Sequence, residues 1–241
     1  NKNYIRKEIN DNLMALISTS GSTGSSKLVR LSYQNFLSNI YSVNKSLPIN
    51  DNDIAITTLP MSYVYGLSII NSHFYRGCTI NLNDKSFVDI NFWKKLEKNK
   101  ITNFGGVPYN YQIIDRLNLE KFDLSNMRYT TLAGGKLNNL ILSRIIKKYK
   151  KLKLKLISMY GASEATARMS YLSWSKAEKK IGSIGKPIAG GKFIIKDIYG
   201  KIVTKPNIEG ELVYKGKNVC MGYAERIKDL NLSDTNKGEL Y

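Results

Sequence analysis

Short apolar stretches alternate with helix-like stretches over the first two thirds of the chain, and this order constrains the fold more than any other feature. The stretches that read as strands are Leu13–Ile17, Ile54–Thr58, Thr79–Leu82, Ile101–Phe104, Tyr129–Leu132 and Leu154–Met159. The stretches that read as helices are one capped by Ser32, Tyr65–Arg76, Asn91–Lys98, one that starts at Pro108 and includes Tyr111–Leu117, and Asn138–Lys150. Such alternation predicts an α/β fold of layered, mostly parallel sheets covered by helices.

The pattern changes after residue 172, where no strong helical periodicity remains. Phe193–Ile195 and Glu211–Tyr214 read as short strands, and glycine-containing turns at 190–191, 199–200 and 215–216 separate the segments. The sequence therefore predicts two parts, an α/β region over residues 1–172 and a smaller β-rich subdomain over residues 173–241.

Length, composition and cysteine usage exclude several classes of protein. With 241 residues, of which 42% are apolar, the chain is long enough to bury a core and too apolar to be disordered. It has no apolar run near the ~20 residues of a membrane-spanning helix, and its polar start does not resemble a signal peptide. Cys78 and Cys220 fit neither a metal-binding spacing nor a disulfide framework. We expect a cytoplasmic protein.

The formal net charge of +18 raises nucleic-acid binding as a hypothesis. The lysines are spread along the chain, however, and Asn, Ile and Tyr are abundant too, which indicates a general compositional bias. In the densest run, Lys151, Lys153 and Lys155 alternate with leucines, a pattern that predicts a strand with one solvated face. Nucleic-acid binding is therefore ranked last among the possible functions.

The segment LISTSGSTGSSKLVRLS at residues 16–32 concentrates glycines and hydroxyl side chains before a lysine. Gly21 and Gly24 can adopt positive φ without steric cost, and Lys27 carries a point charge that suits a phosphate. A flexible linker is the alternative, but the preceding run Leu13–Ile17 reads as a buried strand and apolar residues follow the lysine. The spacing is not that of a P-loop, so the segment predicts an anion-binding loop of another kind.

Two further loops follow predicted strands. Ala133-Gly134-Gly135 comes after one strand, and Tyr160-Gly161-Ala162-Ser163-Glu164 comes after the next. Ligands of open α/β sheets bind beyond the carboxyl ends of the strands, so the three loops fall where a binding site is expected. Taken singly, each has a plain structural alternative: a turn for the glycines, a core or rim position for Tyr160, and a surface carboxylate for Glu164.

Five segments in this order resemble the motifs of the adenylate-forming superfamily, which contains acyl-CoA synthetases, luciferases and the adenylation domains of peptide synthetases. They are STSGSTGSSK, LAGGKL, MYGASEAT, GSIGKPIAGGKF and EGELVYKGKNVCMGY. Two departures are Ser26, where the family usually has proline, and Ser163, where it commonly has threonine. The resemblance covers nearly the whole chain and implies part of the large N-terminal domain, with its distorted, barrel-like β-rich subdomain.

The resemblance also implies ATP and Mg²⁺ as cofactors and a role for each loop. The residues implied in nucleotide binding are Thr19, Ser20, Gly21, Ser22, Thr23, Gly24, Lys27, Gly134, Gly135, Tyr160, Gly161 and Ser163. The loop up to Lys27 would bind the β- and γ-phosphates, Ser163 the α-phosphate, and Tyr160 would lie against adenine. Glu164 would hold Mg²⁺, a hard cation that prefers oxygen ligands. Lys27, Ser163 and Glu164 are the implied catalytic residues.

The acid-binding pocket is implied by the segment LPMSYVYGLS at residues 59–68 and by two later positions. The implied pocket residues are Tyr63, Tyr65, Gly66, Val107 and Gly134. Peptide-synthetase domains place an Asp in this segment to pair with an α-ammonium group, and residues 63–66 contain no carboxylate. We therefore expect an acyl or aryl acid as the substrate. Related ligases often carry His where this chain has Tyr63, whereas the single histidine, His73, reads as a packed helix residue.

The complete protein is expected to activate a carboxylic acid as an acyl-adenylate, with release of pyrophosphate. Transfer to a thiol of coenzyme A, or to the phosphopantetheine of an acyl-carrier protein, would follow. The family has a region before the phosphate loop, and a ribose-binding Asp and a small domain with a catalytic lysine after it, so we expect an excised part of the large domain. A nucleotide-binding module without turnover is the alternative, and a basic nucleic-acid-binding protein ranks last.

Overall fold

The computed structural model describes residues 9–18 and 27–240, and it divides into two compact units. The first unit comprises the described residues of Asn1–Asn39, Ala162–Ala167 and Gly190–Tyr241, and the second comprises Ile40–Gly161 and Arg168–Ala189. These bounds differ from the predicted division at residues 172 and 173.

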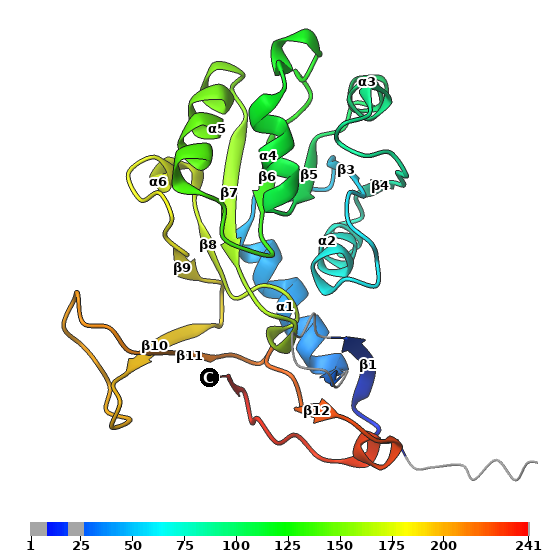
Figure 1. Cartoon of the computed structure of the whole chain (residues 1–241). Helices are drawn as coiled ribbons and strands as arrows, with labels where there is room; N and C mark the ends of the chain where they lie inside the picture. Colours follow the sequence, from blue (N-terminus) through cyan, green and yellow to red (C-terminus); the bar gives the residue numbers. More distant parts are fainter. Residues whose placement is uncertain (1–8, 19–26, 241) are drawn as a thin grey trace, which may run out of the picture. The chain divides into compact units, whose positions relative to one another are not determined.

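The second unit is built on a seven-stranded sheet (Figure 1). In spatial order its strands are β4 (Thr79–Asn81), β3 (Ile54–Ile56), β5 (Asn103–Gly106), β6 (Tyr129–Leu132), β7 (Lys155–Tyr160), β8 (Ser170–Leu172) and β9 (Lys186–Pro187). The first five are parallel to one another, and β8 and β9 continue the sheet in antiparallel pairing. The prediction of a mostly parallel α/β sheet is confirmed.

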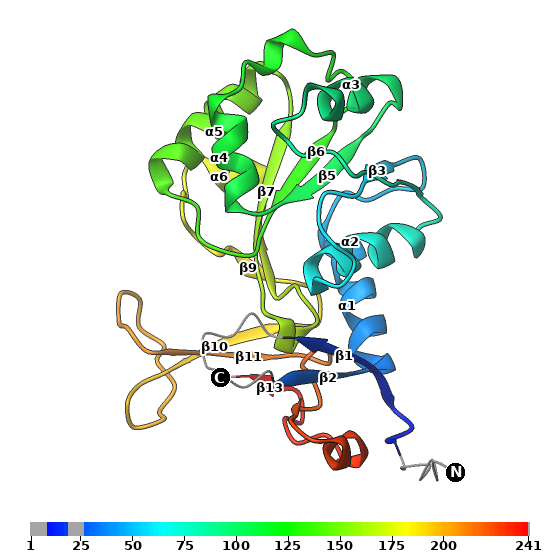
Figure 2. The same ribbon diagram turned by 45° about the vertical axis from the view of Figure 1, so that its right-hand side comes forward.

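Helices cover this sheet, and three of them begin at a capping side chain or a proline (Figure 2). They are α2 (Val64–Phe74), α3 (Ile90–Lys98), α4 (Pro108–Arg116), α5 (Asn139–Lys151), the short α6 (Trp174–Ala177) and the 3₁₀ turn η1 (Leu119–Lys121). The side chains of Asp89 and Asn138 accept hydrogen bonds from first-turn amides of α3 and α5, and Pro108 opens α4.

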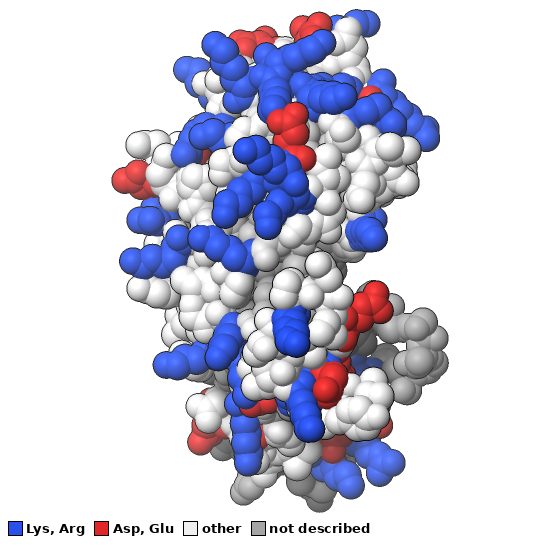
Figure 3. All heavy atoms as spheres, turned by 90° about the vertical axis from the view of Figure 1, so that its left-hand side faces the viewer, with Lys and Arg blue, Asp and Glu red and all other residues white. Residues whose placement is uncertain are grey.

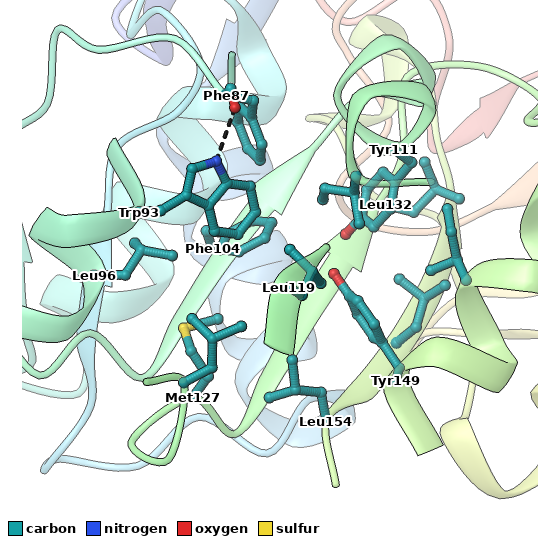
Figure 4. Packing of buried hydrophobic residues seen from close by; sticks show 14 of the residues in the cluster. Phe87, Trp93, Leu96, Phe104, Tyr111, Leu119, Met127, Leu132, Tyr149 and Leu154 are labelled. Atoms are coloured by element: carbon teal, nitrogen blue, oxygen red, sulfur yellow. Dashed lines mark hydrogen bonds between the residues drawn. The ribbon is translucent and has the colours of Figure 1, made fainter. Parts of the chain in front are cut away.

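An aromatic and aliphatic cluster forms the core of the second unit (Figure 4). The Phe87 ring contacts those of Trp93 and Phe104, with centroids 6.0 and 5.3 Å away in edge-to-face geometry. The Trp93 indole N–H donates to the Phe87 carbonyl oxygen at 2.8 Å, so this polar group is satisfied inside the core. The core therefore packs the helices against the sheet.

The first unit contains two small antiparallel sheets. One has the order β1 (Leu13–Ser18), β2 (Leu28–Ser32) and β12 (Tyr223–Ala224), and the other β10 (Lys192–Lys196), β11 (Glu211–Lys215) and β13 (Glu239–Leu240). Two 3₁₀ turns, η2 (Ser163–Ala165) and η3 (Ile227–Asn231), belong to this unit. Helix α1 (Tyr33–Ser46) starts after Ser32, whose hydroxyl accepts from the Asn35 amide at 3.1 Å, so the predicted cap is confirmed.

Two local predictions are wrong. Leu13–Ile17 forms a strand, but of these residues only Ile17 is buried, and in the described part of the chain β1 pairs on one side only, with β2. The alternating run at 151–156 is not one strand, because α5 continues to Lys151 and Lys153 adopts a left-handed φ of 56°. The lysines in the last turn of α5 interact favourably with the helix dipole, and only the residues from Lys155 onward join β7.

Candidate functional site

In the second unit, the carboxyl ends of three adjacent parallel strands carry predicted site residues (Figure 1). Strand β5 leads into Val107, β6 leads into Gly134 and Gly135, and β7 ends at Tyr160. Residues Gly106 and Leu132 are register partners, as are Leu132 and Ser158, so these ends lie at one edge of the sheet.

Gly134, Tyr63 and Val107 lie together at this edge. Gly134 has a φ of +83°, and a Cβ added there would lie 2.7 Å from the Tyr63 hydroxyl oxygen and 3.0 Å from Val107 Cγ1. Burial raises the pKa of the half-buried Tyr63 hydroxyl, so this group stays protonated at neutral pH. A glycine is required here both by the backbone conformation and by the close approach of the tyrosine.

Tyr65 and Gly66 occupy packed positions inside the second unit. The Tyr65 hydroxyl donates to the Thr131 carbonyl oxygen at 3.1 Å and lies 2.7 Å from Thr131 Oγ1, and its ring lies under the buried Arg168 guanidinium at 5.2 Å. A Cβ at Gly66 would lie 2.3 Å from the Pro60 carbonyl oxygen. Both residues thus fix α2 against its surroundings.

Tyr160 and His73 differ in exposure. Tyr160 ends β7 with 39% of its surface exposed, and its carbonyl oxygen accepts from the Met169 amide at 2.9 Å. His73 is buried in α2 with Nδ1 2.7 Å from the Ile69 carbonyl oxygen, so its interpretation as a packed helix residue is confirmed. Burial lowers the pKa of His73.

A surface hollow opens beyond the carboxyl ends of β3 and β4, also in the second unit, with a volume of ≈ 480 Å³. Its lining residues are Thr57, Leu59, Pro60, Met61, Leu82, Asn83 and Asp84. None of the predicted site residues lines this hollow, although three of its lining residues, Leu59, Pro60 and Met61, shortly precede Tyr63 in the sequence.

In the first unit, the turn η2 presents Ser163 and Glu164. The Tyr223 hydroxyl donates to Glu164 Oε1 at 2.9 Å, and the Glu164 carbonyl oxygen accepts from the Cys220 amide at 2.7 Å. Lys27, directly before β2, forms an ion pair with Glu225 at 2.9 Å, and both side chains are about half exposed. The predicted phosphate-loop residues Thr19, Ser20, Gly21, Ser22, Thr23 and Gly24 lie outside the described residues.

The residues present fit a magnesium ion that is shared with a nucleotide. Among the described residues, no three His, Cys, Asp or Glu side chains gather into a metal-binding group. Mg²⁺ is usually bound by one or two carboxylates together with substrate phosphates and water, rather than by a cage of protein ligands. The half-buried Glu164 carboxylate, oriented by the Tyr223 hydroxyl, is a suitable single protein ligand of this kind.

Three basic side chains of α5 have partners within the second unit. Arg144 pairs with Asp115, Lys150 pairs with Glu178, and Lys148 Nζ donates to three carbonyl oxygens at the end of α4. Figure 3 shows that Lys and Arg side chains predominate on this face, with a few acidic side chains among them. This distribution is typical of a solvated charged surface. No helix in the described part of the chain is long and apolar enough to cross a membrane.

The sequence gives no local signal for several residues that the structure adds to the site. Tyr223 lies within the recognised segment EGELVYKGKNVCMGY, but its contact with Glu164 joins residues 59 positions apart. Asn218 donates from Nδ2 to the Ala165 carbonyl oxygen at 2.7 Å, again across a long separation. The buried Arg168, whose guanidinium lies over the Tyr65 ring, is two residues past the MYGASEAT motif, and no sequence pattern singles it out.

Comparison with protein families and curated proteins gives consistent results. The family model described as AMP-binding enzyme matches residues 3–224. A 2-succinylbenzoate--CoA ligase of Bacillus cereus is 30% identical over 214 residues, which is 88% of this chain and 43% of the relative. The enzyme of the same name from Bacillus mycoides is 30% identical over 226 residues, with 92% of this chain and 45% of the relative covered. The chain spans less than half the length of these relatives.

Solved structures show the same fold. The inhibitor-bound N-terminal domain of FACL13 from Mycobacterium tuberculosis has a TM-score of 0.82 at 20% identity, covering 97% of this chain and 57% of that one. O-succinylbenzoate Coenzyme A Synthetase (MenE) from Bacillus subtilis, in complex with ATP and magnesium ion, has a TM-score of 0.78 at 24% identity, covering 93% and 45%. At these identities the likeness concerns the fold.

Proposed function

The chain belongs to the AMP-binding enzyme family, and on that premise we propose that its parent protein uses ATP to activate a carboxylic acid. A carboxylate oxygen of the acid bonds to the α-phosphorus of ATP, and the bond from that phosphorus to the pyrophosphate oxygen breaks. The products are an acyl-adenylate and pyrophosphate. The observation that carries the proposal is the single family match over residues 3–224, which includes all three predicted ligand-binding loops.

We assign the nucleotide to the loops at the strand ends. Thr19–Gly24 and Lys27 bind the β- and γ-phosphates, and the half-exposed position of Lys27 leaves its ammonium within reach of solvent and ligand. Gly134 and Gly135, without side chains, allow close approach of the nucleotide or the acyl group. Tyr160, exposed at the end of β7 and followed by Gly161, stacks on adenine.

Ser163 and Glu164 serve the reacting phosphates. Ser163 donates a hydrogen bond to the α-phosphate, and Glu164 is the protein ligand of Mg²⁺. When bound, Mg²⁺ neutralises charge on the phosphates and so favours departure of pyrophosphate. The hydrogen bond that Glu164 accepts from Tyr223 supports this assignment, because carboxylates that bind metals are commonly oriented by such partners.

The acid is an acyl or aryl acid rather than an α-amino acid. The proposed pocket residues are Tyr63, Tyr65, Gly66, Val107 and Gly134, of which Tyr63, Val107 and Gly134 lie together at the sheet edge. None of them offers a carboxylate to an ammonium group. The relatives' names support the same choice, since they specify 2-succinylbenzoate, an aryl acid.

Coenzyme A is the proposed acceptor thiol, because the relatives are named as CoA ligases. The phosphopantetheine of an acyl-carrier protein is the second candidate. The location is proposed to be cytoplasmic, where the free, buried thiols of Cys78 and Cys220 would stay reduced. Nucleotide binding without turnover is less well supported, because the relatives are ligases.

Pyrophosphate exchange in the full-length parent tests the proposal. The panel contains 2-succinylbenzoate, benzoate, short and long fatty acids and α-amino acids, each with ATP and Mg²⁺. We expect exchange with at least one acyl or aryl acid, and a loss of about 100-fold or more in Glu164→Gln. Glu97→Gln, on the exposed surface of α3, is the matched control. Absence of exchange with every acid, together with tight ATP binding, would favour the module without turnover.

A further inference from the structure

A hydrogen bond joins the candidate metal ligand to a tyrosine from a distant segment. The Tyr223 hydroxyl lies 2.9 Å from Glu164 Oε1, within the first unit. A tyrosine hydroxyl is protonated at neutral pH and a carboxylate only accepts, so the hydroxyl is the donor in this bond.

The backbone that carries Tyr223 is fixed from two sides. Tyr223 is the register partner of Val29 in the pairing of β12 with β2. The buried guanidinium of Arg30 donates from Nε to the Tyr223 carbonyl oxygen at 3.2 Å and from Nη2 to the Met221 carbonyl oxygen at 2.7 Å. Gly222 between them has a φ of +111°, and a Cβ there would lie 2.3 Å from Thr235 Oγ1.

The turn that carries Glu164 is attached to the same segment. The Glu164 carbonyl oxygen accepts from the Cys220 amide at 2.7 Å. Thr166 Oγ1 donates to the Asn218 carbonyl oxygen, and Asn218 Nδ2 donates to the Ala165 carbonyl oxygen, both at 2.7 Å. The backbones of Glu164 and Tyr223 are therefore held in one frame, and the tyrosine hydroxyl fixes the rotamer of the carboxylate as well.

We propose that Tyr223 is a positioning residue, which orients the Glu164 carboxylate for Mg²⁺ when nucleotide is bound. The inference rests on the proposed function, since it takes Glu164 as the metal ligand. One carboxylate oxygen accepts from Tyr223, and the bond limits rotation of the side chain so that the second oxygen keeps a fixed direction. Such partners of metal ligands contribute about 10- to 100-fold to metal affinity.

The test measures how strongly Mg²⁺ tightens ATP binding in the full-length parent. Calorimetry gives the Kd of ATP in EDTA and the Kd of ATP in excess Mg²⁺, and their ratio is the metal contribution. We expect Tyr223→Phe to reduce this ratio by about 10-fold and to leave the Kd in EDTA unchanged. Tyr199→Phe, at an exposed position of the same unit, is the control and should leave both values unchanged.

Glu164→Gln and the double variant separate failure of the inference from failure of the proposed function. If Glu164→Gln lowers the ratio but Tyr223→Phe does not, the metal ligand is right and the positioning role is wrong. If Glu164→Gln leaves the ratio unchanged, Glu164 is not the ligand and both assignments fall. An equal loss in EDTA for Tyr223→Phe would mean a merely structural role. In the Glu164→Gln background, Tyr223→Phe should cause no further loss, because the two residues act through one contact.

Discussion

Replacing Gly134 by alanine tests whether the edge of the sheet is built around the Tyr63 hydroxyl. Gly134 has a φ of +83°, and its added Cβ would lie 2.7 Å from that hydroxyl oxygen. Gly77 provides a matched control because its φ is +73° and no heavy atom lies within 4 Å of its added Cβ. Both substitutions introduce the same backbone strain, and only the first adds a steric conflict.

The two effects can be sized separately. The left-handed backbone conformation costs a non-glycine residue about 1 kcal/mol. Gly77→Ala introduces only this strain, so it should lower the free energy of unfolding by about 1 kcal/mol. Overpacking adds about 1–3 kcal/mol in a tight core, and the exposed rim position of Gly134 places its penalty near the low end. We therefore expect Gly134→Ala to destabilise the chain by about 2 kcal/mol in total.

A double variant assigns the difference to a single atom. Tyr63→Phe removes the oxygen at 2.7 Å, after which the nearest remaining ring atom, Tyr63 Cζ, is 3.8 Å from the added Cβ, an ordinary contact. Urea titration of Gly134→Ala, Gly77→Ala, Tyr63→Phe and Gly134→Ala with Tyr63→Phe gives the coupling. The double variant should recover about half of the loss, with the rest due to strain and to Val107. Equal destabilisation by the two glycine variants, or no recovery in the double variant, would refute the close approach.

Three further predictions follow from buried charge and from the pocket. Arg30→Met removes the buried donor of four hydrogen bonds, to the carbonyl oxygens of Met221, Tyr223, Leu232 and Ser233, and should lower the free energy of unfolding by about 3 kcal/mol in urea titrations, whereas the exposed Arg226→Met should change it little. Because the pKa of His73 is lower in the folded state, the unfolded state binds its proton first, so stability should fall as pH drops below about 6.5 until the folded-state pKa is passed. This slope, measured from pH 7.5 to 5, should disappear in His73→Asn. In the parent, α-amino acids should exchange pyrophosphate at least about 10-fold more slowly than the best acyl or aryl acid, since an unpaired ammonium would be desolvated, and a fastest rate with an α-amino acid would contradict the pocket.

Local patterns in the sequence predict most of the second unit. Each parallel strand overlaps a stretch that reads as a strand, and helix α4 begins at Pro108 as predicted. The failures occur where local pattern and tertiary pairing disagree. Lys153 interrupts an apparent strand period because α5 has to turn into β7 there. Strand β2 follows the lysine of the predicted loop and lies between β1 and β12, and its pairing with β12, almost 200 residues away, has no local signal in the sequence.

The same distinction between local pattern and tertiary contact applies to the candidate site. The motif order predicts which loops are involved, and the structure brings Tyr63, Val107 and Gly134 together at one edge. The phosphate loop lies outside the described residues, so its role stays a prediction. The partner of Glu164 could not be predicted, because no periodicity or spacing relates a turn at residue 164 to a hydroxyl at residue 223.

The conformation of the backbone after Glu164 is a second, independent indication that the position of this carboxylate matters for function. Thr166 and Ala167 have φ values of 52° and 82°, and a β-branched residue in the left-handed region is a strained one. Strain of about 1–2 kcal/mol per residue persists only where the surroundings compensate for it. Here the compensation is visible, because the Thr166 hydroxyl and the Asn218 side chain bond the turn to the segment that also carries Tyr223. A relaxed turn would need neither bond. The chain retains a strained turn and the contacts that hold it, which is the expected pattern where one carboxylate must keep a fixed place.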